Sequence, residues 1–296
     1  MGSEDVVPGA GRALLPELAR IPGHLVWRAQ ARVLLLLGEN LPAGVDIHAY
    51  AVLLALADGT PRSQQALADA VAVSRTTMVR VAAELVEQGL VERVRNPADR
   101  RSYALTRTRA ATGAVRRWQR HVARLEEAIA RPFTPNEREE LRRLLLAIVR
   151  DDLDPTAPAP LLESIGFLIT RVHFRMHRDF SAALAPLRLE PRHFGVLTAL
   201  RETGPVAQAS LARALGVSGA SVVQMVDDLE RRGVVERRRL ATDRRTQVLH
   251  LLPEADDVLA RASKVAAEMH GTVLRPLTKR QTDRLVALLV KLITAA

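Results

Sequence analysis

The chain of 296 residues has no cysteine, few aromatic residues and no long hydrophobic run. The missing cysteines exclude disulfides, thiolate metal ligands and cysteine nucleophiles. The longest aliphatic run, Val33 to Leu37, is far shorter than the roughly 20 residues that span a bilayer. The first residues are acidic and lack the hydrophobic stretch of a secretory signal. We therefore expect a soluble, cytoplasmic protein with no membrane association.

Motifs that carry catalysis are missing as well. The sequence has no glycine-rich phosphate loop and no Gly-x-Ser-x-Gly nucleophile turn, so we expect no enzyme activity, no catalytic residue and no cofactor. His173 and His177 have a spacing that can chelate zinc on one helix. No third ligand stands near them in the sequence, and we expect no metal site.

Positive charge, in contrast, is abundant. The chain has 43 basic and 33 acidic residues, a net charge of +10, and all but three of its basic residues are arginines. The hydrophobic share of 48% is that of a globular protein and excludes a fully disordered chain. A charge surplus of this size favours polyanionic partners, either nucleic acid or an anionic membrane surface.

The two halves of the chain repeat one another at a constant offset of 144 residues. Glu-Gln-Gly-Leu-Val-Glu-Arg at 87–93 matches Arg-Arg-Gly-Val-Val-Glu-Arg at 231–237, and Asp-Arg-Arg occurs at both 99–101 and 243–245. No gap is needed from about residue 21 onward, so the chain contains two copies of one fold. The predicted organisation is an extension over 1–20, a first unit over 21–153, a proline-rich linker over 154–160 and a second unit over 161–296.

Each copy has the pattern of two short helices, a tight turn, a serine-capped helix and a β-hairpin, placed between long helices. In the second copy, Ser218 caps a helix that ends at Gly233, and strands follow over 234–239 and 246–251. The predicted fold class is mainly α with small β-hairpin wings. It consists of tandem winged helix-turn-helix domains on a shared helical platform.

At these residues both copies resemble the MarR family of bacterial transcription regulators. The likeness lies in Leu-Ala-Asp-Ala-Val-Ala-Val-Ser at 67–74, in Leu-Ala-Arg-Ala-Leu-Gly-Val-Ser at 211–218, and in the Asp-Arg-Arg wings. The family normally has one unit per chain and works as a homodimer, often repressing genes until a small, often aromatic ligand releases it. The resemblance therefore implies a single-chain pseudo-dimer, in which Ala72 stands where the other copy has Gly216.

The serine-capped helices are the expected DNA-reading elements, because a major groove admits one helix whose first residues reach base edges. The wing arginines are expected to enter the minor groove. In the first helix we expect Val79, Ala83 and Leu85 to point inward. The alternative is a solvated face without DNA activity, and it weighs more for the second copy, where Gly219 and Ala220 replace two polar residues. The predicted DNA-binding residues are Ser74, Arg75, Thr76, Thr77, Arg80, Arg100, Arg101, Ser218, Ser221, Gln224, Arg244 and Arg245.

The resemblance also places a ligand site between the long helices and each winged core. Core packing is the favoured interpretation for these candidates as a group, and especially for Tyr50 and Phe194, which are equivalent positions. Phe167 and Phe174 add a second apolar face to the helix over 165–180, so we expect that helix to be buried on two sides. The ligand candidates are Trp27, Tyr50 and Trp118 in the first copy and His173, Phe174, His177 and Phe194 in the second.

The leading interpretation is a ligand-responsive repressor that binds an asymmetric double-stranded DNA operator. Its expected partners are this operator and a small aromatic ligand. The chain is expected to be a monomer, because the long helices of each copy satisfy those of the other. The alternative is a small-molecule-binding or sequestering protein on a winged-helix scaffold that has reduced or lost DNA binding.

Overall fold

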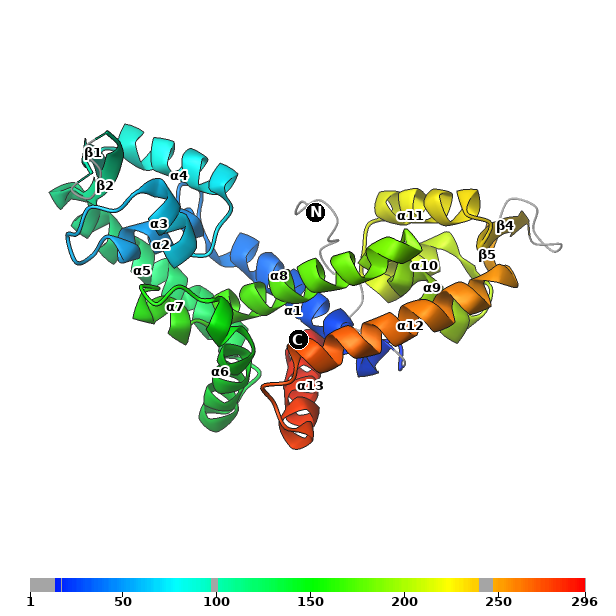
Figure 1. Cartoon of the computed structure of the whole chain (residues 1–296). Helices are drawn as coiled ribbons and strands as arrows, with labels where there is room; N and C mark the ends of the chain where they lie inside the picture. Colours follow the sequence, from blue (N-terminus) through cyan, green and yellow to red (C-terminus); the bar gives the residue numbers. More distant parts are fainter. Residues whose placement is uncertain (1–13, 17, 97–100, 240–246, 296) are drawn as a thin grey trace. The chain divides into compact units, whose positions relative to one another are not determined.

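The computed structural model describes residues 14–16, 18–96, 101–239 and 247–295. The described chain is mainly helical with two small antiparallel sheets, which confirms the predicted fold class of repeated winged helices (Figure 1). Three predicted wing residues, Arg100, Arg244 and Arg245, lie outside the described residues.

The chain divides into two compact units, which are described separately. We call Leu35–Arg171 the contiguous unit, and the residues up to Leu34 together with those from Val172 onward the split unit. The dividing points fall inside two long helices, α1 (Pro22–Asn40) and α8 (Ile165–Leu184), and not in the proline-rich stretch between the sequence repeats. Each unit therefore holds a complete winged motif and one end of a long helix from the other repeat.

The contiguous unit is built around one apolar cluster. Buried residues of its winged motif pack with Trp118, while Phe167 is partly buried against the same cluster. In the wing, β1 pairs antiparallel with β2, and Arg62 and Leu105 exchange two backbone hydrogen bonds of 2.8 and 3.0 Å. The elements after α1 are α2 (Ile47–Ala55), α3 (Gln64–Ala70), α4 (Arg75–Glu87), β1 (Val91–Arg95), β2 (Tyr103–Arg107), α5 (Arg109–Ala130), α6 (Pro135–Val149), η3 (Arg150–Asp152) and α7 (Ala159–Glu163).

The split unit repeats this arrangement with a third strand. The two-residue strand β3 adds to the hairpin in the order β3-β5-β4, an element too short for its pattern to be seen in the sequence. The elements, with the α1 and α8 segments that belong to this unit, are η2 (Leu18–Arg20), η4 (Ala185–Leu187), α9 (Pro191–Thr203), β3 (Val206–Ala207), α10 (Gln208–Leu215), α11 (Gly219–Arg231), β4 (Val235–Arg239), β5 (Gln247–Leu251), α12 (Glu254–Val273) and α13 (Lys279–Thr294).

The turn between the two short helices has a left-handed residue in both copies, but only one of the two is a glycine. Gly216 has φ of 71°, a left-handed conformation that glycine adopts without a steric penalty. Ala72, at the equivalent position, has φ of 56° although it carries a Cβ. This backbone conformation is therefore dictated by the fold in both copies, and the Ala72 turn is strained.

The long helix α8 is buried mainly on one face. Ile165, Leu168 and Ile169 are fully buried, whereas Phe174 is 52% exposed. The expectation that this helix is buried on two sides is therefore wrong at Phe174. Among the described residues no single helix is long and apolar enough to cross a membrane; α10 and α11 meet that criterion only as a pair bent by 109°.

Candidate nucleic-acid interface and ligand pocket

Helix α4 presents a mixed polar and apolar face to solvent. Ser74 caps it, since its hydroxyl accepts a hydrogen bond from the Thr77 amide at 3.1 Å. The buried positions of α4 are Met78, Val81, Ala82 and Leu85, and the exposed ones near its start are Arg75, Thr76, Val79, Arg80 and Ala83. The prediction that Val79 and Ala83 point inward is therefore wrong, because the buried stripe begins at Met78. Leu85 is buried as predicted.

Arg80 is held by two carboxylates. Its Nη1 lies 2.8 and 2.9 Å from the two Glu84 oxygens, and its Nη2 lies 3.1 Å from Asp46 Oδ2. The hydrogen bonds that Arg80 donates to Glu84, and then to Asp46, raise its pKa. Asp46 also caps α2 by accepting hydrogen bonds from the amides of His48 and Ala49. The guanidinium is thus fixed on the exposed face, with half of its side chain open to solvent.

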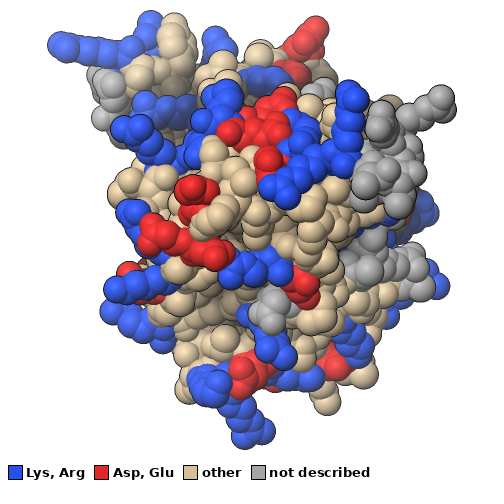
Figure 2. All heavy atoms as spheres, turned by 90° about the vertical axis from the view of Figure 1, so that its right-hand side faces the viewer, with Lys and Arg blue, Asp and Glu red and all other residues tan. Residues whose placement is uncertain are grey.

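Helix α11, the equivalent of α4, has a less charged face. Ser218 caps it through the Ser221 amide at 3.1 Å. The exposed residues near its start are Gly219, Ala220, Val223 and Gln224. Arg237 on the adjoining strand is paired with Asp227 at 2.7 Å and with Glu230. Figure 2 shows carboxylates lying among the arginines at this end of the split unit, so positive charge there is locally neutralised.

The described part of the first wing carries an aromatic residue that the sequence analysis did not single out. The Arg95 guanidinium lies 4.9 Å from the centre of the Tyr103 ring, and Tyr103 is 58% exposed. The two residues are opposite one another in the β1–β2 register. Alternation along the hairpin would have placed both side chains on one face. Arg101 is exposed in the same wing.

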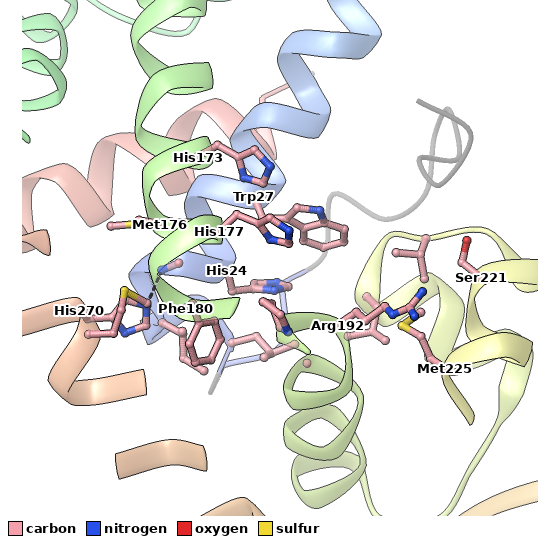
Figure 3. A pocket seen from close by; sticks show the side chains of 18 residues that line it. His24, Trp27, His173, Met176, His177, Phe180, Arg192, Ser221, Met225 and His270 are labelled. Carbon is pink, nitrogen blue, oxygen red and sulfur yellow. Dashed lines mark hydrogen bonds between the residues drawn. The ribbon is translucent and has the colours of Figure 1, made fainter. Parts of the chain in front are cut away.

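A cavity of about 130 Å³ lies inside the split unit. Helices α1, α8, α9, α11 and α12 all contribute side chains to it (Figure 3). Three ligand candidates line it together, Trp27 from the first copy of the repeat and His173 and His177 from the second. His24 and His270 complete a largely apolar wall of imidazole and indole rings. A cavity of this size is close to one that accepts a benzene ring.

The imidazoles of this cavity are neutral at physiological pH. Burial lowers the pKa of His24 to about 3, with a further contribution from Arg28. Burial also lowers the pKa of His173 to about 4, with help from His177, and that of His270 to about 4. The neutral His270 accepts a hydrogen bond on Nε2 from the Gly23 amide at 3.1 Å. The buried Nε2 of His24 has no hydrogen-bond partner in the structure.

The remaining ligand candidates lie elsewhere. Tyr50 and Trp118 are buried in the apolar cluster of the contiguous unit. Phe194 is 5% exposed and packs edge-on against Phe180, a residue that lines the cavity. Phe174 points largely into solvent. Only Trp27, His173 and His177 of the predicted set are therefore brought together around one cavity.

The equivalent place in the contiguous unit is occupied by larger or charged side chains of the protein itself. Phe167 stands where the split unit has Gly23, and it packs against the apolar cluster. Arg171 replaces Trp27 and donates a hydrogen bond from Nη1 to the Ala72 carbonyl at 2.9 Å. Glu126 replaces His270 and accepts a hydrogen bond from the Ile165 amide at 3.1 Å. Burial raises the pKa of this carboxyl.

His173 and His177 stack with ring centres 5.8 Å apart. In the part of the chain that the structure describes, no group of three His, Cys, Asp or Glu side chains is placed to hold a metal ion. The neutral rings of this cavity offer apolar contact, and each imidazole has one hydrogen-bond donor and one acceptor nitrogen.

Several residues of the DNA-facing helix α4 and of the cavity could not be identified from the sequence. Asp46 reaches Arg80 across 34 residues, a contact that no local pattern encodes. His24, Arg192 and His270 come from three different helices and meet only in the folded unit. The exposure of Val79 was detectable, because Met78, Val81, Ala82 and Leu85 at steps of three, one and three already make up the buried face of a 3.6-residue helix.

The fold and these two faces define a protein with two winged helix-turn-helix units in one chain. A model of the MarR family matches residues 43–102 and 189–246, which contain both winged motifs. Among solved structures, the transcriptional repressor CouR bound to a 23-mer DNA duplex is 35% identical. The match covers 44% of this chain and 93% of CouR, with a TM-score of 0.42.

A second similar structure is a MarR variant from E. coli in complex with operator DNA. It is 25% identical, and the match covers 44% of this chain and 91% of that one, with a TM-score of 0.40. CouR from Rhodococcus jostii RHA1 bound to p-coumaroyl-CoA is 28% identical, covering 42% of this chain and 88% of that one, with a TM-score of 0.39. The doubled family match shows that the chain carries two units of the MarR family.

Proposed function

We propose that this chain is a sequence-specific regulator of transcription that binds double-stranded DNA and responds to a small aromatic ligand. The observation that carries the proposal is the pair of serine-capped helices, α4 and α11, each with an exposed face and each followed by a hairpin wing. Two of the matched structures contain DNA, and one of them is a transcriptional repressor, which is the mode of action that we propose for this chain.

The DNA-reading residues that we propose are those expected from the sequence. On α4 they are Ser74, Arg75, Thr76, Thr77 and Arg80, and on α11 they are Ser218, Ser221 and Gln224. Arg101 joins them in the described part of the first wing, and Arg100, Arg244 and Arg245 are proposed on sequence grounds alone. Because α4 offers two arginines where α11 offers Gly219 and Gln224, the first copy is expected to supply most of the affinity for an operator with two unlike half-sites.

The two carboxylates on Arg80 bear on this role. In the free protein they hold the guanidinium fork in one position, which reduces the entropy lost when it contacts a guanine edge or a phosphate. Arg80→Ala is expected to weaken DNA binding by about 1–3 kcal/mol and to relax base preference in one half-site. Gln224→Ala should have a smaller effect, confined to the other half-site.

The test is fluorescence anisotropy with DNA from upstream of the protein's own gene, followed by selection from random DNA. Arg143→Ala, an exposed arginine on α6 far along the chain from α4, is the matched control and should bind like the wild type. Binding that loses no affinity between 50 and 200 mM salt would contradict the proposal. Selected sites that are perfect palindromes would also contradict it, if Arg80→Ala and Gln224→Ala relax the base preference equally in both half-sites.

We further propose that the ligand occupies the cavity of the split unit. Its size fits a single aromatic ring, and its neutral imidazoles accept hydrogen bonds from a hydroxyl or amine on that ring. Ser221 and Met225 of α11 line the same cavity, so a ligand there contacts the proposed reading helix directly. A ligand can shift DNA affinity only through such differential contacts.

The chain is proposed to act as a monomer that presents both winged motifs, a pseudo-dimer. Light scattering on a size-exclusion peak should give one chain mass of 32.5 kDa. A stable dimer at low concentration would contradict this part of the proposal.

A small-molecule-binding protein with lost DNA activity is the second candidate. The observation in its favour is the coincidence, within the split unit, of a formed cavity and an α11 whose exposed residues near its start carry no charge. Ligand binding without any DNA binding at low salt would select this candidate over the regulator.

A further inference from the structure

Two exposed valines occupy the same position in the two proposed reading helices. Val79 on α4 is 59% exposed and Val223 on α11 is 40% exposed. Each is the fifth residue after the capping serine, and each lies between exposed residues of the first helical turn and the next polar residue. The other large hydrophobic residues exposed among the described ones are Leu34, Tyr103 and Phe174.

Single exposed apolar residues are common on protein surfaces and by themselves indicate nothing. Here the neighbours differ between the copies while the valine does not. Arg75 and Thr76 are replaced by Gly219 and Ala220, and Arg80 is replaced by Gln224. Valine is also a weaker helix former than alanine on a solvated face, because its branched side chain loses rotamer freedom. Local stability therefore does not account for a valine at both positions.

We propose that Val79 and Val223 each contact the 5-methyl group of a thymine in the major groove. This inference rests on the proposed DNA-binding function and names a base that both half-sites share. The thymine methyl is the apolar group that a base edge offers in this groove, and apolar side chains recognise it. A valine on the outer face, one turn from the helix start, is at the depth where recognition helices reach base edges.

The residues next to the two valines differ in their hydrogen-bonding groups, so the valine is the contact that the two helices share. On α4 the neighbouring Arg80 is tied to Asp46 and Glu84, and on α11 the neighbouring Gln224 has no charge. The two helices are thus expected to differ in the base that they read at the Arg80 or Gln224 position. They are expected to agree on a thymine at the adjacent position, which gives an asymmetric operator one symmetric feature.

Deoxyuridine gives a direct test, since it differs from thymidine only by lacking the methyl group. An operator is first selected from random DNA with the wild-type chain, and each thymine in it is then replaced singly by deoxyuridine. One replacement in each half-site should weaken binding about three- to fivefold, the ratio that corresponds to burial of about one methyl group. Replacements at other thymines should have little effect.

Val79→Ala and Val223→Ala, combined with the deoxyuridine replacements, give a double-mutant cycle between protein and DNA. Each variant should lose about the same factor on thymine DNA and should lose nothing further when deoxyuridine stands at its own half-site. It should keep the full deoxyuridine effect at the other half-site. Val86→Ala, a partly buried valine near the end of α4, is the control that should keep both deoxyuridine effects.

Each outcome decides between the possibilities. If the chain binds a selected operator but no thymine is sensitive to loss of its methyl group, or if both variants keep the sensitivity, the valine contact is wrong and the regulator proposal stands. If no operator is selected at all, both proposals fail. Unchanged thermal unfolding of the two alanine variants will show that any loss of affinity comes from the DNA contact.

Discussion

The two units carry the same winged motif but treat the space beside it differently. In the split unit, Gly23 and Trp27 of α1 leave a cavity next to α11 that His270 borders. In the contiguous unit the equivalent residues are Phe167, Arg171 and Glu126, and they engage the apolar cluster, the Ala72 carbonyl and the start of α8. The split unit has a cavity at these positions, whereas the contiguous unit uses the equivalent residues for internal packing and hydrogen bonds.

A fused chain makes this difference possible. A homodimer must build both sites from one sequence, whereas here each site has its own residues. The ligand response and the DNA contacts can then be improved in separate units. The exposed faces follow the same division, since α4 carries Arg75 and Arg80 and α11 carries residues without charge near its start. We expect the contiguous unit to supply most of the DNA affinity and the split unit to bind the ligand.

The largest expected effect comes from emptying the filled site. Phe167→Ala should lower the free energy of unfolding by about 2–4 kcal/mol, because it removes a large ring that packs on the core of the contiguous unit. Phe174→Ala, on the same helix but 52% exposed, is the matched control and should change it by less than about 1 kcal/mol. Urea denaturation measures both. Equal losses would mean that the Phe167 ring does not fill the place in the contiguous unit that is equivalent to the cavity of the split unit.

The buried imidazoles give the split unit a dependence on pH. His173 is neutral when folded, with a pKa near 4, so below its unfolded pKa of about 6.5 the unfolded state binds the proton first. Stability is therefore full above pH 6.5 and falls on acidification towards pH 4. His173→Asn should reduce the loss between pH 7.5 and pH 5 by about 1–2 kcal/mol, measured by urea denaturation at each pH. A loss identical to that of the wild type would show that His173 is already accessible to protons.

The smallest expected effect is at the strained turn. Ala72→Gly should raise the free energy of unfolding by about 0.5–1 kcal/mol, since glycine adopts φ of 56° without the penalty that a Cβ brings. The reverse change, Gly216→Ala at φ of 71°, should lower it by a similar amount. Thermal or urea unfolding of both variants provides the measurement. Destabilisation by Ala72→Gly would place the strain elsewhere.

The repeat and its elements were predictable from the sequence because they depend on local signals. Ser74 and Ser218 cap their helices as expected, and Gly233 ends the motif before the predicted hairpin with φ of 67°. These features arise within a few residues of chain, where spacing and chemistry determine conformation.

The cavity and the Arg80 contacts depend on which surface a helix packs against, which periodicity does not specify. Trp27 precedes His173 by almost half of the chain, yet both line one cavity. A helix can also have two apolar sides without burying both, as the exposed Phe174 shows. Val79 was predicted to point inward, but the buried stripe of α4 begins one residue earlier, at Met78, and leaves Val79 exposed where we propose that it reads thymine.

The most direct test of the difference between the two units uses its two tryptophans, one in each unit. Trp27 lines the cavity of the split unit, and Trp118 is buried in the cluster of the contiguous unit. With 5-fluorotryptophan incorporated and the signals assigned by Trp118→Phe, ¹⁹F NMR can follow both units while phenol, a single-ring probe, is added. The account predicts that the Trp27 resonance shifts and saturates while the Trp118 resonance stays in place. A shift of both resonances, of Trp118 alone or of neither would contradict it.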